Sequence, residues 1–451
     1  PADKKGIPVR SIVGDFTINQ AGILQLAPTD VQLLKKGIIS LQGDTDTANK
    51  SLNIDAQLKN ITLDDFIQPS FADALNGSIK LRGNYTEPKA LWTLNSQRVK
   101  SQGEVQLTTD TNKGQQTILL NKASFTPQNG GEMNLAGKLE LFNKQQLQLN
   151  LTSKNFNPNK IYPDFPTGDV NGEIKLNGEL TDLVLNGKMN FAPSTLSGVT
   201  LRGTADVQYQ QQHLSRAISD IALGRNHLRT HGSFGKAGDK LNIDLNAPEL
   251  DKVGFGLSGA LTAQGYIAGE PQKIEANLTG NARNLKVQQA AQIQQLDFKI
   301  QGSPDLNRPL NLQLQGKQLI ITGNSPTRID HVNLGINGTG TRHSIQGNGS
   351  MALDGKPYKL NLAANGGLSP QNQWKGTVNT LDINGAFNLK LQNSMNLEAG
   401  AERVSMSAAR WAMMGGSLNL NSFVWDKAQG LTSKGSASNL HISQLHNFFT
   451  P

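Results

Sequence analysis

The sequence of 451 residues contains no cysteine and few aromatic or charged side chains. The absence of cysteine excludes disulfide scaffolds, cysteine-ligated zinc sites, iron–sulfur clusters and cysteine nucleophiles. Aromatic residues make up only 5% of the chain and charged residues only 17%. No run approaches the ~18 consecutive apolar residues of a membrane-spanning helix, so these residues do not describe an integral helical membrane protein.

The charge of the chain is weak and evenly spread. There are 43 basic and 35 acidic residues, which gives a formal net charge of +8. A nucleic-acid-binding protein concentrates its positive charge in a stripe with stacking aromatic side chains, and the sequence shows no such stripe. We therefore expect no nucleic-acid partner. A mildly basic soluble surface is the simpler interpretation, and attraction to anionic lipid headgroups is the alternative.

Apolar residues recur at every second position along most of the chain. Typical runs are Leu52–Leu58, Leu147–Leu151 and Leu241–Leu245. A period of two places successive side chains on opposite faces of a β-strand. Each strand therefore has one apolar and one polar face, which is typical of antiparallel sheets. The sequence predicts an all-β fold.

Glycines punctuate these strands in a repeated pattern of Gly-x-apolar-x-apolar-x-Gly. Copies occur at Gly77–Gly83, Gly131–Gly137, Gly172–Gly178 and Gly349–Gly355. Short strands separated by turn residues are typical of a sandwich, barrel, propeller or solenoid-like array. The spacing between the copies is irregular, which disfavours a strict propeller or leucine-rich repeat.

Helical patterns are few. Short helices are predicted near residues 28–37, where Pro28-Thr29-Asp30 resembles a helix start and Gly37 a helix end. Further short helices are predicted near 64–76 and at 441–449. Loop-rich stretches at 155–168 and 303–309 suggest soft boundaries between three groove segments of one continuous elongated domain, namely 1–154, 155–302 and 303–451.

Four architectures fit the alternating pattern. An outer-membrane barrel needs strands of ~9–11 residues with aromatic girdles, and a large sandwich usually has more aromatic core residues. A parallel β-helix stays possible. We favour a long sheet curled into a trough, because aliphatic walls with few bulky side chains suit a groove that holds acyl chains. A dry core closed between two walls predicts the same pattern, so both arrangements stay open.

If the trough is correct, the apolar positions of the strands form a lipid-binding groove. We predict that its lining consists of Leu52, Ile54, Leu58, Ile79, Leu81, Leu147, Leu149, Leu151, Ile174, Leu176, Leu241, Ile243, Leu245, Leu310, Leu312, Leu314, Leu360, Leu362, Leu389, Leu391, Leu418 and Leu420.

Signatures of catalysis are weak. Gly254–Gly259 matches GxGxxG, but the alternating residues around it predict a strand and not a strand-to-helix phosphate turn. His227 and His231 would lie ~13 Å apart in a strand, too far for one metal ion. Asp64-Asp65 and Glu402 stand in unrelated contexts and do not form an obvious catalytic carboxylate pair. We predict no enzyme, no cofactor and no metal.

Several stretches in the middle and at the end of the chain form a specific pattern. They are Leu223–Leu228, Gly232–Gly235, Gly238–Leu241, Ala247–Leu250, Gly340–His343, Trp374–Gly376, Gly416–Leu418 and Phe423–Trp425, followed by Leu440, Leu445 and Phe448. An additional element precedes them at Asn157-Pro158 and Phe165–Gly172. Together these stretches resemble the TamB family, from about residue 100 to residue 449.

This resemblance implies a repeating β-groove, or β-taco, of the AsmA-like, bridge-like lipid-transfer group. It implies a periplasmic protein of Gram-negative bacteria, anchored in the inner membrane when full-length, that carries phospholipids between the inner and outer membranes. It also implies a link to outer-membrane protein and autotransporter assembly through a partner, TamA. The chain starts without Met or a signal stretch, so we expect an internal fragment, with TamA contacted through parts outside it.

Two other functions fit the pattern. An assembly scaffold could add strands of an outer-membrane client to an open sheet edge. A β-helical carbohydrate-active enzyme would instead show acidic residues clustered on one face of a solenoid.

Overall fold

The computed structural model describes residues 9–34, 37–62, 73–110, 112, 114–288, 290–322, 327–353 and 355–441. Contacts divide the chain into two compact units, unit 1 (Pro1–Gly224) and unit 2 (Arg225–Pro451). The described residues of both units are almost entirely β-strand, and the helical turns among them are two three-residue 3-10 turns. The all-β prediction is confirmed.

The described residues of unit 1 form fifteen strands and one 3-10 turn. They are β1 (Val9–Val13), β2 (Phe16–Ile18), β3 (Ile23–Leu33), β4 (Ile38–Asp46), β5 (Ser51–Ile61), β6 (Leu75–Asn84), β7 (Pro88–Asn95), β8 (Val99–Asp110), β9 (Gln115–Pro127), β10 (Glu132–Glu140), β11 (Gln146–Phe156), η2 (Pro158–Lys160), β12 (Gly168–Glu179), β13 (Val184–Leu196), β14 (Val199–Gln210) and β15 (His213–Leu223).

Unit 2 begins with β16 and ends with β31. Its elements are β16 (Asn226–Gly232), β17 (Lys240–Ala247), η3 (Leu250–Lys252), β18 (Leu257–Glu270), β19 (Lys273–Val287), β20 (Ala291–Gly302), β21 (Pro309–Ile321), β22 (Thr327–Thr339), β23 (His343–Leu353), β24 (Lys356–Leu368), β25 (Trp374–Asn384), β26 (Asn388–Leu391), β27 (Met395–Ala399), β28 (Arg403–Met406), β29 (Ala409–Met413), β30 (Gly416–Asp426) and β31 (Gly430–Ser438).

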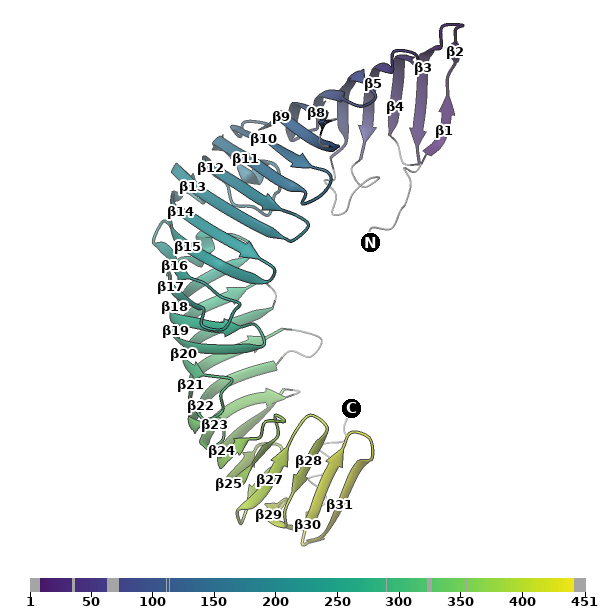
Figure 1. Ribbon diagram of the computed structural model, residues 1–451. Helices are drawn as coiled ribbons and strands as arrows, with labels where there is room; N and C mark the ends of the chain where they lie inside the picture. The colour runs from purple at the N-terminus through teal and green to yellow at the C-terminus, as the bar shows by residue number, and fades with distance from the viewer. Residues whose placement is uncertain are drawn as a thin grey trace. The chain divides into compact units, whose positions relative to one another are not determined.

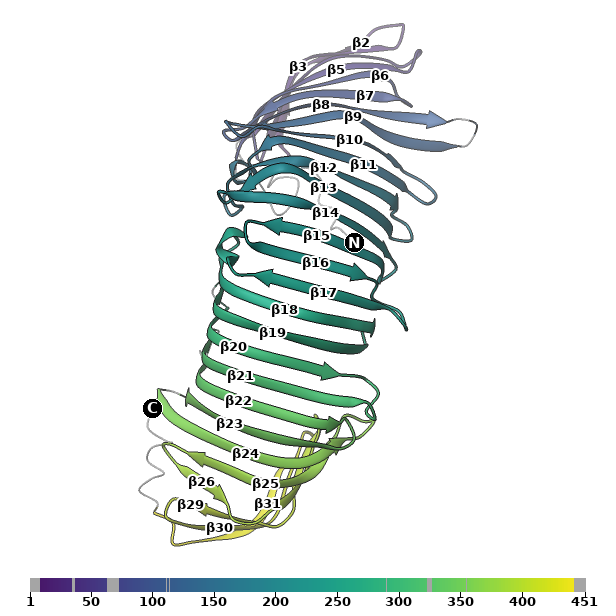
Figure 2. The same cartoon turned by 90° about the vertical axis from the view of Figure 1, so that its left-hand side faces the viewer.

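Each unit is a meander of antiparallel strands. In unit 1, strands β3 to β15 each pair with the next strand along the chain (Figure 1). In unit 2 the same order runs from β16 to β25, where the strands lie side by side in Figure 2. Alternating residues therefore build two continuous faces on each unit, one apolar and one polar.

β-Bulges interrupt this pairing at several places, and two of the bulges contain an asparagine. The register shifts after Leu58 in β5 and after Ser153 in β11, where Asn60 and Asn155 have φ of 53° and 48°. Asparagine tolerates this left-handed conformation better than most residues. A bulge bends its strand and increases the local twist, so the two strands turn at these positions.

Each of these bulges is hydrogen-bonded by a second asparagine, which we call the clasp residue. The backbone N–H of Asn60 donates to Oδ1 of Asn76 at 2.9 Å, and the N–H of Asn155 donates to Oδ1 of Asn171 at 2.8 Å. Beyond the bulges, Ile61 is 3% and Phe156 9% exposed. The repeated pair of asparagines thus fixes the bend that buries the end of the strand.

Replacing the clasp residue Asn171 by alanine is expected to lower the free energy of unfolding by about 1–2 kcal/mol. The variant removes the acceptor for the Asn155 N–H and the donor to Pro193 O at 2.9 Å. Chemical denaturation followed by circular dichroism measures the change. Asn150→Ala is the matched control, because Asn150 is exposed on the neighbouring strand and should cost less than about 0.5 kcal/mol. Equal effects of the two variants would contradict the clasp.

The helix predicted at 28–37 is wrong. Residues up to Leu33 belong to β3, which pairs with β1 on one side and β4 on the other. The predicted helix at 441–449 falls on residues outside the described ones, except His441. Most of the helix predicted at 64–76 also lies outside them, and its last two residues begin β6.

The two loops predicted as soft boundaries both connect paired strands. The loop at 155–168 contains η2 and joins β11 to β12, and the loop at 303–309 joins β20 to β21. Each is a long connection within one unit.

The last strands of unit 2 close over their own apolar face. β25 pairs along its length with β27 and then β26, and β30 pairs in the same way with β29 and then β28. A buried cluster lies between them, which we call the end cluster: Ala364, Val378, Leu391, Met395, Ala409 and Trp411. This part of the sheet has a buried, packed core.

Candidate functional site: an accessible apolar face

The predicted lining residues lie in register on the apolar face. In unit 1, Ile54 is opposite Leu81 and Leu149 is opposite Leu176. In unit 2, a row of cross-strand partners crosses four strands without interruption: Ile300, Leu312, Ile336 and Ile345. Such aliphatic pairs stabilise neighbouring strands, and here they also form a continuous apolar surface in each unit.

Most of this surface remains accessible to solvent. Among the predicted lining residues only Leu241 (9% exposed) and Leu391 (6%) are buried, and Ile174 is exposed at 39%. The others are half-buried, including Leu149 and Leu312 at the centres of their strands. A dry two-layer core would bury central aliphatic residues almost completely. Away from the end cluster, each unit therefore exposes an uncovered apolar face.

Five of the predicted lining residues have a different environment. Leu391 belongs to the end cluster, and Leu362, Leu389, Leu418 and Leu420 pack against it. These residues contribute to a closed core in the structure, so the accessible face of unit 2 is formed by the residues of β17 to β24 that precede the cluster.

Few bulky side chains were expected on the walls, and the aromatic side chains on the apolar face were missed by the sequence reasoning. Several aromatic rings lie close to a glycine of an adjacent strand, where an added Cβ would overlap the ring. The rings thus occupy space that the glycines leave. These pairs are Trp92 with Gly103, Phe298 with Gly280, and Trp374 with Gly366. The sequence signal that could have located these rings is a glycine at a position where the alternation predicts an apolar side chain.

The indole N–H groups of both tryptophans have hydrogen-bond partners. Nε1 of Trp92 donates to Oγ of Ser101 at 3.0 Å. Nε1 of Trp374 donates to Nε2 of His343 at 3.0 Å, and Nδ1 of that imidazole bonds Thr339 O at 2.9 Å. Since Trp374 is a donor, Nε2 of the buried His343 is the acceptor and Nδ1 carries the proton. The bond fixes the orientation of the Trp374 ring.

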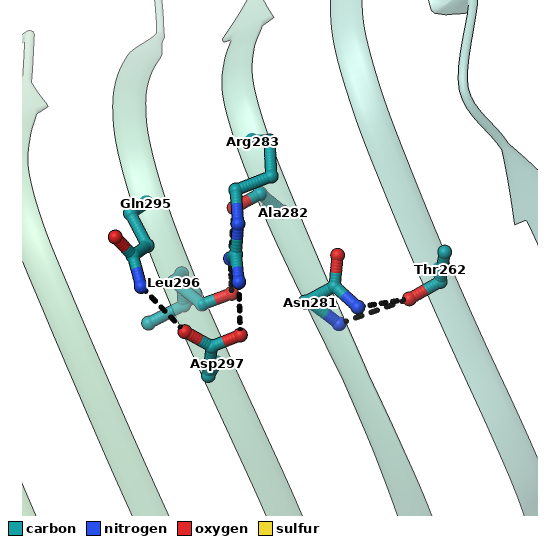
Figure 3. A network of polar contacts seen from close by, with 7 residues as sticks. All are labelled: Thr262, Asn281, Ala282, Arg283, Gln295, Leu296 and Asp297. Atoms are coloured by element: carbon teal, nitrogen blue, oxygen red, sulfur yellow. Dashed lines mark hydrogen bonds and ion pairs between the residues drawn. The ribbon is translucent and has the colours of Figure 1, made fainter.

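The opposite face of unit 2 is polar and internally bonded. Figure 3 shows Arg283 bonded to Asp297 at 2.5 Å, while Nε2 of Gln295 donates to the same carboxylate at 2.9 Å. The Arg283 guanidinium, followed by Gln295, lowers the pKa of Asp297 below its usual range. Beside them, Nδ2 of Asn281 donates to Oγ1 of Thr262 at 2.7 Å. These bonds join side chains of β18, β19 and β20 across the polar face.

A shallow hollow of about 880 Å³ also lies on this polar face. Its walls come from six strands and consist mainly of amide, hydroxyl and charged groups, among them Asn246, Thr262, Asp297 and Lys299. A surface of this composition does not suit an acyl chain, because the chain would desolvate polar groups without bonding them. The two faces of the sheet therefore differ sharply in chemistry.

The structure also shows where the weak catalytic signatures lie. His227 and His231 are on strand β16, opposite Asn246 and Asn242. The strand predicted through Gly254–Gly259 is wrong at its start, because residues 254–256 form a turn and β18 begins only at Leu257. This turn follows η3 and leads into a strand, whereas a dinucleotide turn leads into a helix. Among the residues the structure describes, no three His, Asp or Glu side chains are grouped to hold a metal ion.

A comparison with known families identifies the chain. Residues 100–450 match the family described as TamB, N-terminal domain, which confirms the resemblance predicted from about residue 100 to residue 449. Within the described residues, no helix is long and apolar enough to cross a membrane. The match covers most of the chain, which therefore belongs to the TamB family, a group of non-enzymatic transport and assembly proteins of the Gram-negative cell envelope.

Proposed function

We propose that the apolar face of each unit carries the acyl chains of phospholipids through the periplasm, while the headgroups stay in water. The observation that carries this proposal is the continuous, half-exposed apolar face that crosses successive strands in register. Large uncovered apolar surfaces are unfavourable in water and mark sites that a ligand or partner covers. The direction of transfer, between inner and outer membranes, and the link to a TamA-type partner come from the family resemblance.

Phospholipids fit this face better than a compact ligand does. The aliphatic residues repeat across strands spaced ~4.8 Å apart, which gives a long surface without a single enclosed pocket. A flexible acyl chain can cover such a surface, and each buried methylene contributes about 0.8 kcal/mol. The rings of Trp92, Phe298 and Trp374, which occupy the space beside glycines of adjacent strands, add further apolar surface for an acyl chain.

Quenching of tryptophan fluorescence by phospholipids with brominated acyl chains tests the proposal. All four tryptophans lie at apolar-face positions, with Trp92 opposite Ile79 and Trp425 opposite Val404. We expect the brominated lipid to quench their emission, and unbrominated lipid to leave it unquenched. A fifth tryptophan placed on the polar face by Gln313→Trp should add emission that resists quenching. Purified protein that retains no phospholipid and shows no quenching would refute the proposal.

A second function is favoured by strand β31. Every residue of this strand is exposed, and among the described strands it pairs only with β30. An edge of this kind can accept an extended segment of another protein by strand addition. A scaffold role in outer-membrane protein assembly predicts that an unfolded outer-membrane strand peptide slows amide hydrogen exchange in β31. Unchanged exchange in the presence of saturating peptide would argue against it.

A further inference from the structure

The end cluster contains a polar group that the fold does not satisfy. Trp411 is 4% exposed, and its Nε1 has no hydrogen-bond partner among the described residues. Leaving a buried donor unbonded is costly, and buried tryptophans usually bond their N–H. Trp92 and Trp374 follow that rule, with acceptors at 3.0 Å. The unbonded indole of Trp411 is therefore an exception on the same face.

The neighbourhood of Trp411 is rich in methionine. Four of the seven methionines of the chain lie within residues 395–414. Met395 belongs to the end cluster and Met406 packs against it, and Met414 is buried at 2% exposure. Methionine is unbranched and polarizable, so it repacks around ligands of different shapes more readily than leucine or isoleucine. Met395 in the cluster and Met406 beside it are therefore the side chains that can most easily make room for a guest.

The end cluster also lies in line with the accessible face. Ile345 and Leu362 pack against it from strands β23 and β24, and the cross-strand row of Leu312, Ile336 and Ile345 leads to it. A chain that lies on the apolar face of unit 2 therefore reaches the cluster without crossing polar side chains.

We propose that the end cluster is a binding site for the glycerol end of a diacyl phospholipid, with Trp411 Nε1–H donating to an ester carbonyl oxygen. This inference rests on the proposed acyl-carrying function. The methionines move aside for the upper part of the acyl chains, and the carbonyl supplies the acceptor that the indole lacks. In such an apolar environment a hydrogen bond is stronger than in water.

Paired lipids provide the test. We choose dihexanoyl phosphatidylcholine with ester-linked chains and its diether analogue, both used as monomers below their micelle concentration. The diether keeps the chains and the headgroup but lacks the carbonyl oxygens. Isothermal titration calorimetry on the full 451-residue chain should show that the diester binds about fivefold more tightly, as expected for one hydrogen bond.

Two matched variants separate ligand binding from folding. Trp411→Phe keeps an aromatic ring but removes the N–H together with the five-membered ring, so the lost packing should lower the melting temperature of the lipid-free protein. The diagnostic readout is therefore the ratio of the two affinities, and the preference for the diester should disappear. Trp374→Phe removes the same atoms and also breaks the bond to His343, so it should lower the melting temperature as well and leave the preference for the diester unchanged.

The outcomes distinguish this inference from the broader proposal. Equal binding of both lipids to the wild-type protein, or a diester preference that survives in Trp411→Phe, would overturn the assignment to Trp411 and leave the acyl-carrying function standing. Absence of binding of either lipid would overturn both. Loss of the diester preference in Trp411→Phe, with the preference retained in Trp374→Phe, would support the site.

Discussion

Replacing Leu312 by aspartate is expected to reduce the phospholipid bound to the apolar face of unit 2 at least tenfold. Leu312 lies at the centre of β21 on the apolar face, between Ile300 and Ile336. An acyl chain that covers this position would bury an unpaired carboxylate, which costs far more than the contact contributes. Because Leu312 is only half-buried, the fold should lose no more than about 1–2 kcal/mol. Phosphate analysis of the purified protein and quenching by brominated lipid both measure the effect.

The adjacent residue provides the control. Gln313 is exposed on the polar face, so Gln313→Asp introduces the same charge one residue away and should leave lipid binding unchanged. The same comparison applies to unit 1 with Leu149→Asp and Gln148→Asp. If the polar-face variants reduce lipid binding as strongly as the apolar-face variants, the assignment of the faces is wrong.

Substitution of Gly103 by alanine should have the largest effect on the shape of the apolar face in unit 1. The added Cβ would overlap the ring of Trp92, which lies against this glycine. The ring must then move away and lose its bond to Ser101. We expect a loss of about 2–3 kcal/mol in stability, together with weaker lipid binding in unit 1.

A double-mutant cycle identifies the cause. In a Trp92→Leu background the ring is absent, so the further cost of Gly103→Ala should be smaller by at least ~1 kcal/mol. The remaining cost reflects the carbonyl of Lys122, which lies 2.7 Å from the Cβ position. Additive effects of the two substitutions would show that the ring does not depend on the glycine.

Face assignment could be predicted from sequence because it depends only on a period of two. One residue of slippage would move every leucine of a strand to the water-facing side, and the observed pairs, such as Leu149 with Leu176, keep all of them on one side. The turn glycines between the strands could also be recognised in the sequence, although the order of the strands was not predicted. Both the alternation and the turn glycines depend only on residues that are close together in the sequence, which is why they could be recognised there.

Strand β3 shows where local signals mislead. Pro28-Thr29-Asp30 has the composition of a helix start, but the register of β3 against β4 shifts between Leu26 and Thr29. Proline suits such a bulge because it has no backbone N–H to offer the ladder. Strands on both sides of β3 supply its remaining hydrogen bonds, and this pairing outweighs the intrinsic preference of a few residues.

The difference between the open face and the end cluster could not be predicted, because both use the same alternation. Leu312 and Leu391 occupy equivalent positions in the pattern, yet one is half-exposed and the other is 6% exposed. What separates them is the closure of β25 to β30, which depends on contacts between strands distant in the pattern. The concentration of methionines was the one local hint.

The neighbour-to-neighbour pairing of the strands has a consequence for evolution. From β17 to β24 each strand bonds to the strands immediately before and after it, so the loss or duplication of one hairpin leaves all other ladders able to form. Each duplicated hairpin would lengthen the sheet by ~10 Å. Related chains can therefore differ in length by whole hairpins, without the redesign of a core.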